Sequence, residues 1–321
     1  MLEAKLRQSV ATVSAASAVL LPAIAFLSYQ PVAQAIDDPI ESQMVTIEFE
    51  GRVGDETFAC NETYRLGTAD SEVAPLDFRL YVSEVALLDA AGNAVPLVLE
   101  QDGQWQHQNV ALLDFEDKTG SCANGTPEVR TQVIGSVPAG EYSGLKFTVG
   151  VPFALNHIDS TLAPSPLNLT SLWWNWNFGY KFARIDFQRI VDTAALDLKA
   201  KHTSSAAASD EASTETDALA QAFSIHLGSV GCQLDSAQAP VNCTLPHRPE
   251  VALTDFDPAQ NTVVADISAL LADTDMSQNQ EGTAVGCMSN PLDNDCSGIL
   301  QNFGLPFREQ PAGEQTIFSV E

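Results

Sequence analysis

In the stretch MVTIEFE, residues 44–50, apolar and polar side chains alternate from Val45 onward. In an extended chain successive side chains point to opposite faces, so Val45, Ile47 and Phe49 share one face. The polar side chains of Thr46, Glu48 and Glu50 lie on the other face. This alternation predicts a half-buried β-strand.

Short runs of the same kind recur along the chain, separated by turn clusters such as residues 91–93, 124–125 and 138–140. Many short strands with frequent turns predict an all-β fold, an antiparallel β-sandwich with immunoglobulin-like layering and disulfide-stapled loops. Little helix is expected, and residues 265–272 are the best helical segment. The further strands are expected at 78–82, 95–99, 109–113, 129–133, 145–151, 182–190, 223–227, 251–254 and 316–320.

The first 35 residues have the composition of a secretory signal peptide. Lys5 and Arg7 precede an apolar run over residues 9–28, and Ala33-Gln34-Ala35 supplies small residues for cleavage near Ala35. No second apolar span follows, so we expect no membrane span after cleavage. The sequence therefore predicts a protein of the periplasm or cell surface.

The rest of the chain is expected to form one domain. Residues 36–43 are interpreted as a disordered leader, and residues 44–321 as a single β-sandwich domain. Residues 200–221 are polar, rich in Ser, Thr and Ala, and short of large apolar groups, which indicates a mobile insertion between two strands.

The formal net charge of the whole chain is −27 at pH 7. A polyanion of this size repels a phosphate backbone, so the charge argues against a nucleic-acid partner. Cationic partners and metal ions remain compatible with it.

All six cysteines lie beyond the leader, an even number in a chain expected to be exported, which indicates disulfides. Short separations favour two local pairs and leave a third: Cys232 with Cys243, Cys287 with Cys296, and Cys60 with Cys122. A blue-copper centre needs a free thiolate, which this pairing does not leave. No C-x-x-C motif occurs, so this chain has no haem-attachment site.

The segment SLWWNWNFGYKF, residues 171–182, contains three of the four tryptophans: Trp173, Trp174 and Trp176. A packed core face and a platform for stacking carbohydrate are two interpretations. A third is redox chemistry, because indole and phenol are the side chains most easily oxidised by one electron. The sequence pattern alone leaves all three open.

Histidine is scarce, with five residues in the chain. His107, His157 and His226 lie in or beside expected strands, from which imidazoles can converge on copper, zinc, iron or nickel. No H-E-x-x-H, G-x-S-x-G, P-loop or dinucleotide motif occurs. No acid–base constellation for an enzyme is visible either.

Several motifs together resemble the MbnP-like family, also described as metallo-mystery-pair four-cysteine proteins and related to the copper-repressible protein CorA. The resemblance extends over roughly residues 44–320. Its motifs are PLDFRLYVSEV (75–85), VALLDFED (110–117), GVPFALNH (150–157), WNWNFGYKF (174–182), HLGSVGC (226–232) and GCMS (286–289).

The resemblance implies an exported β-sandwich that works with a di-haem peroxidase-like partner of the MbnH type. That partner oxidises a tryptophan to kynurenine, and the product assists histidine side chains in binding one copper ion for copper homeostasis. Because this chain carries no haem motif, it is expected to be the partner's substrate and not an enzyme.

The resemblance also implies the site residues. His107 and His157 match the family's histidine-bearing segments best, and His226 is a third candidate ligand. Trp174 is the first candidate for modification, followed by Trp176 and Trp173, and Tyr180 is a candidate for hole transfer. The alternative function is that of a metal-free secreted β-sandwich that binds glycan or another protein through the aromatic cluster.

Overall fold

The computed structural model describes residues 41–123, 125–190 and 222–321. The expected signal peptide, most of the leader and the 200–221 insertion lie outside these residues. The leader was expected to extend to residue 43, but strand β1 already begins at Ser42. Pairing with β9 as far as Ser42 explains the earlier start, because the backbone there gains ladder hydrogen bonds.

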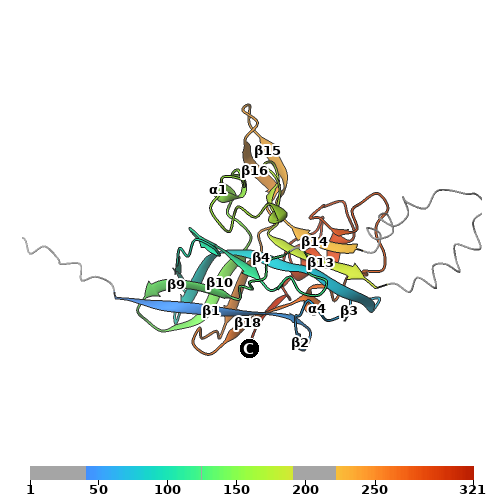
Figure 1. The fold of residues 1–321 in the computed structure, drawn as a ribbon. Helices are drawn as coiled ribbons and strands as arrows, with labels where there is room; N and C mark the ends of the chain where they lie inside the picture. Colours follow the sequence, from blue (N-terminus) through green and yellow to red (C-terminus); the bar gives the residue numbers. More distant parts are fainter. Residues whose placement is uncertain (1–40, 124, 191–221) are drawn as a thin grey trace, which may run out of the picture. The chain divides into compact units, whose positions relative to one another are not determined.

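The described chain is mostly strand, as expected for an all-β sandwich, and two sheets make up most of it (Figure 1). The first sheet runs in the order β20-β18-β1-β9-β6, with β2 beside β1. Its strands are β1 (Ser42–Val53), β2 (Glu56–Thr57), β6 (Val98–Leu99), β9 (Gln132–Pro138), β18 (Thr262–Asp266) and β20 (Phe318–Val320).

The second sheet runs in the order β17-β10-β4-β13-β14-β19. Strands β3, β5 and β8 also pair with β4, and β7 pairs with β8. Its strands are β3 (Tyr64–Leu66), β4 (Ser71–Asp89), β5 (Ala94–Pro96), β7 (Gln106–His107), β8 (Val110–Asp114), β10 (Tyr142–Val149), β13 (Ala183–Arg189), β14 (Ala222–Leu227), β17 (Glu250–Thr254) and β19 (Gly286–Cys287).

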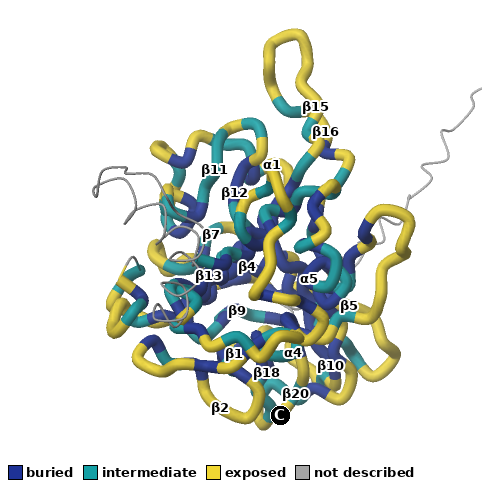
Figure 2. Tube along the Cα trace, turned by 90° about the vertical axis from the view of Figure 1, so that its right-hand side faces the viewer, coloured by how far each residue is buried: buried dark blue, intermediate teal, exposed yellow. Residues whose placement is uncertain are grey.

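The core lies between the two sheets. Phe49 of β1 meets Phe147 of β10 edge-to-face, with ring centroids 5.7 Å apart, and Phe147 also packs on Phe318 of β20. Val45, Ile47 and Phe49 are buried, as the alternation predicted. Figure 2 shows the buried residues concentrated around β4 and its neighbours.

Helices are short throughout the described residues: α1 (Phe153–Asn156), the 3-10 turn η1 (Thr170–Leu172), α4 (Ile267–Leu270) and α5 (Cys296–Asn302). The helix expected at 265–272 is only α4, because Ala265 and Asp266 continue β18 beside β1. The strand expected at 129–133 begins three residues later than predicted and forms β9, Gln132–Pro138. None of the described helices is long and apolar enough to span a membrane.

Two small hairpins stand apart from the main sheets. Strand β11 (Trp173–Asn175) pairs with β12 (Gly179–Tyr180), and β15 (Val230–Leu234) pairs with β16 (Pro240–Leu245). The β15–β16 hairpin projects beside α1, above the second sheet in Figure 1.

The structure forms the three disulfides that the spacing favoured. They join Cys60 to Cys122, Cys232 to Cys243, and Cys287 to Cys296. No free cysteine remains among the described residues.

Candidate metal centre

The tryptophan segment forms the β11–β12 hairpin. Asn175 closes its turn, since the side-chain oxygen accepts hydrogen bonds from the backbone N–H groups of Asn177 and Phe178. Gly179 has φ +80°, a left-handed conformation that favours glycine, and a Cβ there would lie 2.3 Å from the Asn156 carbonyl oxygen. The local sequence therefore fixes where the three indoles lie.

The three tryptophans have different surroundings. Trp173 is half-buried against the core, and its indole nitrogen is buried without a hydrogen-bond partner. Trp174 lines an apolar cavity of about 470 Å³ together with Met288 and Pro291. Trp176 is 45% exposed. Of the three, Trp174 combines partial burial with an open approach.

Tyr180 lies beneath the segment and is fully buried. It pairs with Trp173 across the hairpin and contacts Tyr81 edge-to-face at 5.7 Å between ring centroids. Burial raises the pKa of the Tyr180 phenol, with a further contribution from the charge of Asp159. The candidate hole-transfer residue is therefore a neutral phenol in contact with the ring of Tyr81.

His157 is brought to the tryptophan segment. It follows α1, and its Nδ1 lies 3.1 Å from the carbonyl oxygen of Trp176. A carbonyl only accepts hydrogen bonds, so Nδ1 carries the proton and Nε2 presents its lone pair. Asn156 connects α1 to β12 because its side-chain oxygen accepts a hydrogen bond from Tyr180 N–H. Fixing Nδ1 through a backbone carbonyl is the usual arrangement for a metal-ligating imidazole.

His226 lies on β14 and approaches the segment from the sheet below. Its ring centroid is 6.4 Å from that of Trp174. Its Nε2 lies 2.9 Å from Asp186 Oδ1, so that nitrogen donates to the carboxylate. The structure thus brings together His226 and Trp174, two of the residues predicted from the sequence.

His107 lies on β7, opposite Val110 of β8. The preceding residue, Gln106, is buried and bonds Ile134 of the first sheet, so the His107 side chain points to the outer face of the second sheet. Val110 pairs with Ser83 of β4. His107 therefore shares this face with residues of β4 such as Ser83 and Tyr81.

His107 and His226 cannot bind the same ion. Strand β7 is separated from β14 by β8, β4 and β13, and four steps of about 4.8 Å place the two histidines about 19 Å apart across the sheet. A metal ion bridges ligands within about 2.0–2.3 Å of itself. The three predicted ligands therefore do not form one coordination set, although His157 with one of the others remains compatible with the fold.

His247 is a histidine that the motif analysis did not select. It is buried, and its Nδ1 lies 3.1 Å from the carbonyl oxygen of Gly228. Gly228 in turn packs against the six-membered ring of Trp174, where a Cβ would come within 2.4 Å. His247 lies in a loop after Pro246, and no spacing in the sequence marks it.

Burial lowers the pKa of three imidazoles near the tryptophan segment, those of His157, His226 and His247. For His157 the hydrogen bond to Trp176 opposes the effect of burial, and for His226 the Asp186 carboxylate does so, but the pKa stays lowered in both. Burial also lowers the pKa of His247. Neutral imidazoles are the form that binds metal ions, so at pH 7 these side chains suit a copper or zinc ion.

A row of buried charges lies on the same outer face of the second sheet. Arg79 and Asp77 of β4 form a buried ion pair, and Arg184 of β13 bonds Asp186 at 2.6 Å. Burial alone would raise the pKa of Asp186, but its hydrogen bond with His226 and the charge of Arg184 lower it instead. The carboxylate therefore stays ionised and orients His226.

Two other groups of potential ligands involve the cysteines. The ligand atoms of His157, Cys232 and Cys243 all lie within 4.8 Å of one another, and so do those of Cys60, Glu116 and Cys122. In both groups the two sulfurs form a disulfide, which lacks the thiolate that binds metal.

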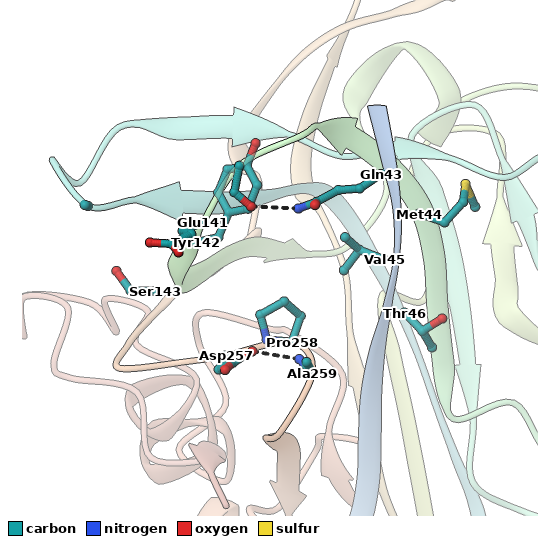
Figure 3. Close-up of a pocket in the computed structure, with 12 residues that line it drawn as sticks. Gln43, Met44, Val45, Thr46, Glu141, Tyr142, Ser143, Asp257, Pro258 and Ala259 are labelled. Carbon is teal, nitrogen blue, oxygen red and sulfur yellow. Dashed lines mark hydrogen bonds between the residues drawn. The ribbon is translucent and has the colours of Figure 1, made fainter. Parts of the chain in front are cut away.

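A cavity larger than the one beside Trp174 lies elsewhere. It measures about 670 Å³ and is bordered by β1 residues such as Gln43 and Met44, by Tyr142 and by the loop at Asp257 (Figure 3). Its lining contains no histidine, cysteine or tryptophan. It has none of the chemistry that the tryptophan segment offers.

Comparisons with known proteins agree on one family. The family model described as MbnP matches residues 42–289. The solved structure of MbnP from Methylosinus trichosporium superposes with a TM-score of 0.70 at 28% sequence identity, over 88% of this chain and 99% of that chain. No curated protein sequence matches this chain.

Proposed function

Because the chain belongs to the MbnP family, we propose that it is an exported copper-binding protein, matured when a di-haem peroxidase-like partner oxidises one tryptophan to kynurenine. The chain acts as the substrate of that partner and not as an enzyme. Its role is in copper homeostasis, in the periplasm or at the cell surface.

The observation that carries this proposal is the meeting of His157 and the tryptophan segment. The Trp176 carbonyl holds His157 Nδ1 and leaves Nε2 as the donor atom for copper. Copper accepts imidazole nitrogen readily, and lowered pKa values keep these imidazoles neutral. We therefore place His157 at the centre of the copper site.

The second ligand is His226 or His107, since the strand order prevents both from binding one ion. The ring contact between Trp174 and His226 favours His226.

Substituting each of the three histidines by alanine distinguishes the two possible ligand pairs, His157 with His226 and His157 with His107. Loss of copper binding in His157→Ala and His226→Ala, with retention in His107→Ala, supports the pair next to Trp174. Loss in His157→Ala and His107→Ala supports the other pair.

Trp174 is the proposed site of oxidation, because it is partly buried and faces an open apolar cavity. Opening the five-membered ring of the indole yields an aromatic amine and a ketone, which adds donor atoms beside the histidines. Tyr180 and the neighbouring indoles provide a route for electron holes from a partner that is too large to reach the ring.

The test is co-expression with a protein carrying two C-x-x-C-H haem motifs, followed by mass spectrometry of the peptide 171–182. Kynurenine differs from tryptophan by a net gain of one oxygen atom and loss of one carbon atom. The change should occur in wild type, occur more slowly in Trp173→Phe and Trp176→Phe, which each lose an indole of the proposed route, and be absent from Trp174→Phe. An unmodified wild-type peptide despite an active partner and peroxide contradicts the maturation.

A second function is favoured by the exposure of Trp176 and Phe178, which are 45% and 36% exposed. Exposed aromatic rings can stack on a glycan or anchor another protein. On this alternative the protein binds no metal. Equal, weak copper binding by wild type and by all three histidine variants would favour it.

A further inference from the structure

The Cys232–Cys243 disulfide crosses the β15–β16 hairpin. The two cysteines lie directly opposite each other in the strand register, with Cα atoms 3.8 Å apart. The hairpin pairs only with itself among the described strands and projects beside α1 (Figure 1). Because the register is set by backbone pairing on both sides, the two sulfurs stay close when the bond between them is broken.

His157 faces this disulfide. Its Nε2 lies 3.6 Å from Cys243 Sγ, and its ligand atom lies within 4.8 Å of both sulfurs. The Trp176 carbonyl fixes the proton on Nδ1, so Nε2 carries the lone pair, which lies near Cys243 Sγ and also accepts a 3.4 Å hydrogen bond from Asn156 Nδ2. One nitrogen from the end of α1 and two sulfurs from the β15–β16 hairpin therefore converge on one point.

We propose that reduction of the Cys232–Cys243 disulfide creates a second metal site, formed by His157 Nε2 and the two cysteine thiolates, for a soft ion such as Cu(I) or Zn²⁺. Thiolate ligands select these ions, and three protein ligands leave a position for water. Tetrahedral sites have metal–ligand distances of about 2.0–2.3 Å, so their ligand atoms lie about 3.5–4 Å apart. The 3.6 Å between His157 Nε2 and Cys243 Sγ fits that spacing, and the two sulfurs would move apart once the bond between them is broken.

The redox step is balanced by a dithiol reductant. Two electrons and two protons pass from the dithiol to the disulfide, so the S–S bond breaks, two thiols form and the dithiol becomes a disulfide. Metal binding then displaces the thiol protons to solvent. In the oxidised protein neither sulfur is a thiolate, so this site exists only after reduction.

This disulfide is the most accessible of the three. Cys232 is half-buried and Cys243 is 7% exposed, whereas Cys60, Cys122, Cys287 and Cys296 are between 0% and 3% exposed. Exchange requires attack by a thiolate on a disulfide sulfur, and access limits its rate. A mild dithiol therefore reduces the hairpin bond first.

The inference goes beyond the proposed function and does not depend on tryptophan oxidation. Both sites use His157 Nε2, so one imidazole cannot serve them together. Reduction would then have one of two effects. Either His157 leaves the proposed copper site, or copper stays on His157 and the two thiolates replace the second histidine as ligands. The redox state of the hairpin thus selects the ligand set around His157.

The experiment uses the full protein produced without any haem partner, so its tryptophans are unmodified. After brief treatment with a dithiol and its removal under anaerobic conditions, alkylation and mass spectrometry identify which cysteines are free. Co²⁺ is titrated into a separate portion of the reduced protein that has not been alkylated, as an optical probe, because a thiolate ligand gives a near-ultraviolet charge-transfer band that imidazole ligands alone do not. We expect alkylation at Cys232 and Cys243 and one equivalent of Co²⁺ with this band.

Two variants isolate the site. Cys232→Ser/Cys243→Ser should show no band, and His157→Ala should bind Co²⁺ more weakly with a shifted band. Cys287→Ser/Cys296→Ser is the matched control and should retain the wild-type spectrum, provided its circular dichroism is native.

The proposal is wrong if the band persists in Cys232→Ser/Cys243→Ser, if His157→Ala leaves both affinity and spectrum unchanged, or if the hairpin cysteines are the last to be alkylated. Any of these results leaves the tryptophan maturation untouched. Conversely, an unmodified tryptophan does not affect the Co²⁺ result, so the two proposals fail separately.

Discussion

Gly228 sets the position of Trp174. An added Cβ would lie 2.4 Å from an atom of the indole ring and 2.8 Å from the Tyr180 carbonyl oxygen. The indole could shift into the open cavity beside it, but the backbone oxygen cannot move without disturbing the β11–β12 hairpin. A glycine at this position therefore lets β14 approach the tryptophan segment closely.

Gly228→Ala should lower the free energy of unfolding by about 1–3 kcal/mol, as overpacking of a close contact does. It should also change the tryptophan fluorescence, since Trp174 must move. Gly140→Ala is the control, because the nearest atom to its Cβ is 3.7 Å away. Denaturant unfolding and emission spectra measure both effects, and equal behaviour of the two variants would contradict the close contact.

Copper binding should depend on pH through His157. Its pKa is lowered from 6.5 by burial, so the imidazole remains neutral as the pH falls to and below that value. A proton competes with copper for the same nitrogen, hence affinity is retained at pH 6.5 and lost only at more acidic pH. Copper titrations between about pH 5 and 7.5 test this expectation around the ordinary histidine pKa. A loss of affinity that is complete above pH 6.5 would show that another titrating group controls binding.

At the level of single residues, the sequence selected some of the side chains that the structure brings together. The motifs selected His157, His226 and Trp174, all of which lie at the tryptophan hairpin. They did not select His247, because a buried histidine in a loop has no periodic pattern to mark it. Nor could they reveal that His107 and His226 lie on strands separated by three others, since that distance depends on strand order.

Within β4, Arg79 and Asp77 lie two residues apart on the same outer face. Both are buried, and the guanidinium donates two hydrogen bonds to the carboxylate. Arg184 of β13 adds a contact to the same carboxylate at 3.2 Å. The strand thus carries an ion pair whose partners are removed from water together.

Arg79→Ala should destabilise the protein by about 3–5 kcal/mol, because the Asp77 carboxylate would be left buried with only Arg184 to compensate. Lys146→Ala is the control. It breaks the Lys146–Glu250 pair, whose side chains are 40% and 66% exposed, and should cost about 0–1 kcal/mol. Urea unfolding of the two variants compares them, and similar midpoints would contradict the role given to the buried pair.

Asp114 ends β8 near this ion pair. Burial raises its pKa to about 8, although the Arg79 charge opposes the shift. The folded state therefore holds a proton that the unfolded state releases near pH 3.8. The stability that protonated Asp114 contributes to the folded state is fully present below pH 3.8, and it is lost as the pH rises through about 8.

Asp114→Asn removes this titration. The variant should lose less stability than wild type between pH 5 and 8, since an amide stays neutral throughout that range. Thermal melts at several pH values test this expectation. Parallel pH profiles for the two proteins would mean that Asp114 is ionised in the folded state.

At the scale of strands, alternation predicted the elements better than their pairing. Val45, Ile47 and Phe49 were assigned to the buried face and lie there. Strand β18 was not expected, and its parallel pairing with β1 joins residues far apart in the sequence. The segment 265–272 suggested a helix locally, but ladder bonds with β1 extend the strand through Asp266. Tertiary pairing outweighed local preference there.

For the molecule as a whole, acidity and disulfides act together. A net charge of −27 produces self-repulsion that opposes the compact state and is screened by salt. The three disulfides oppose it by restricting the unfolded chain. The disulfides close loops of different length, with sequence separations of 62 residues for Cys60–Cys122, 11 for Cys232–Cys243 and 9 for Cys287–Cys296.

Cys60–Cys122 should therefore contribute most to global stability. In the chain-entropy model, closing a loop of 62 residues is worth about 4 kcal/mol and one of 11 residues about 3 kcal/mol. Cys60→Ala/Cys122→Ala should lower the free energy of unfolding by about 4 kcal/mol or more, because its partners are buried and their loss also weakens core packing. Cys232→Ala/Cys243→Ala should have a smaller effect, since its hairpin pairs with neither main sheet.

Denaturant unfolding at low and high salt measures the free energy of unfolding of both variants, and added salt should recover part of the lost stability in each. A larger effect from the hairpin disulfide would mean that β15–β16 unfolds together with the core.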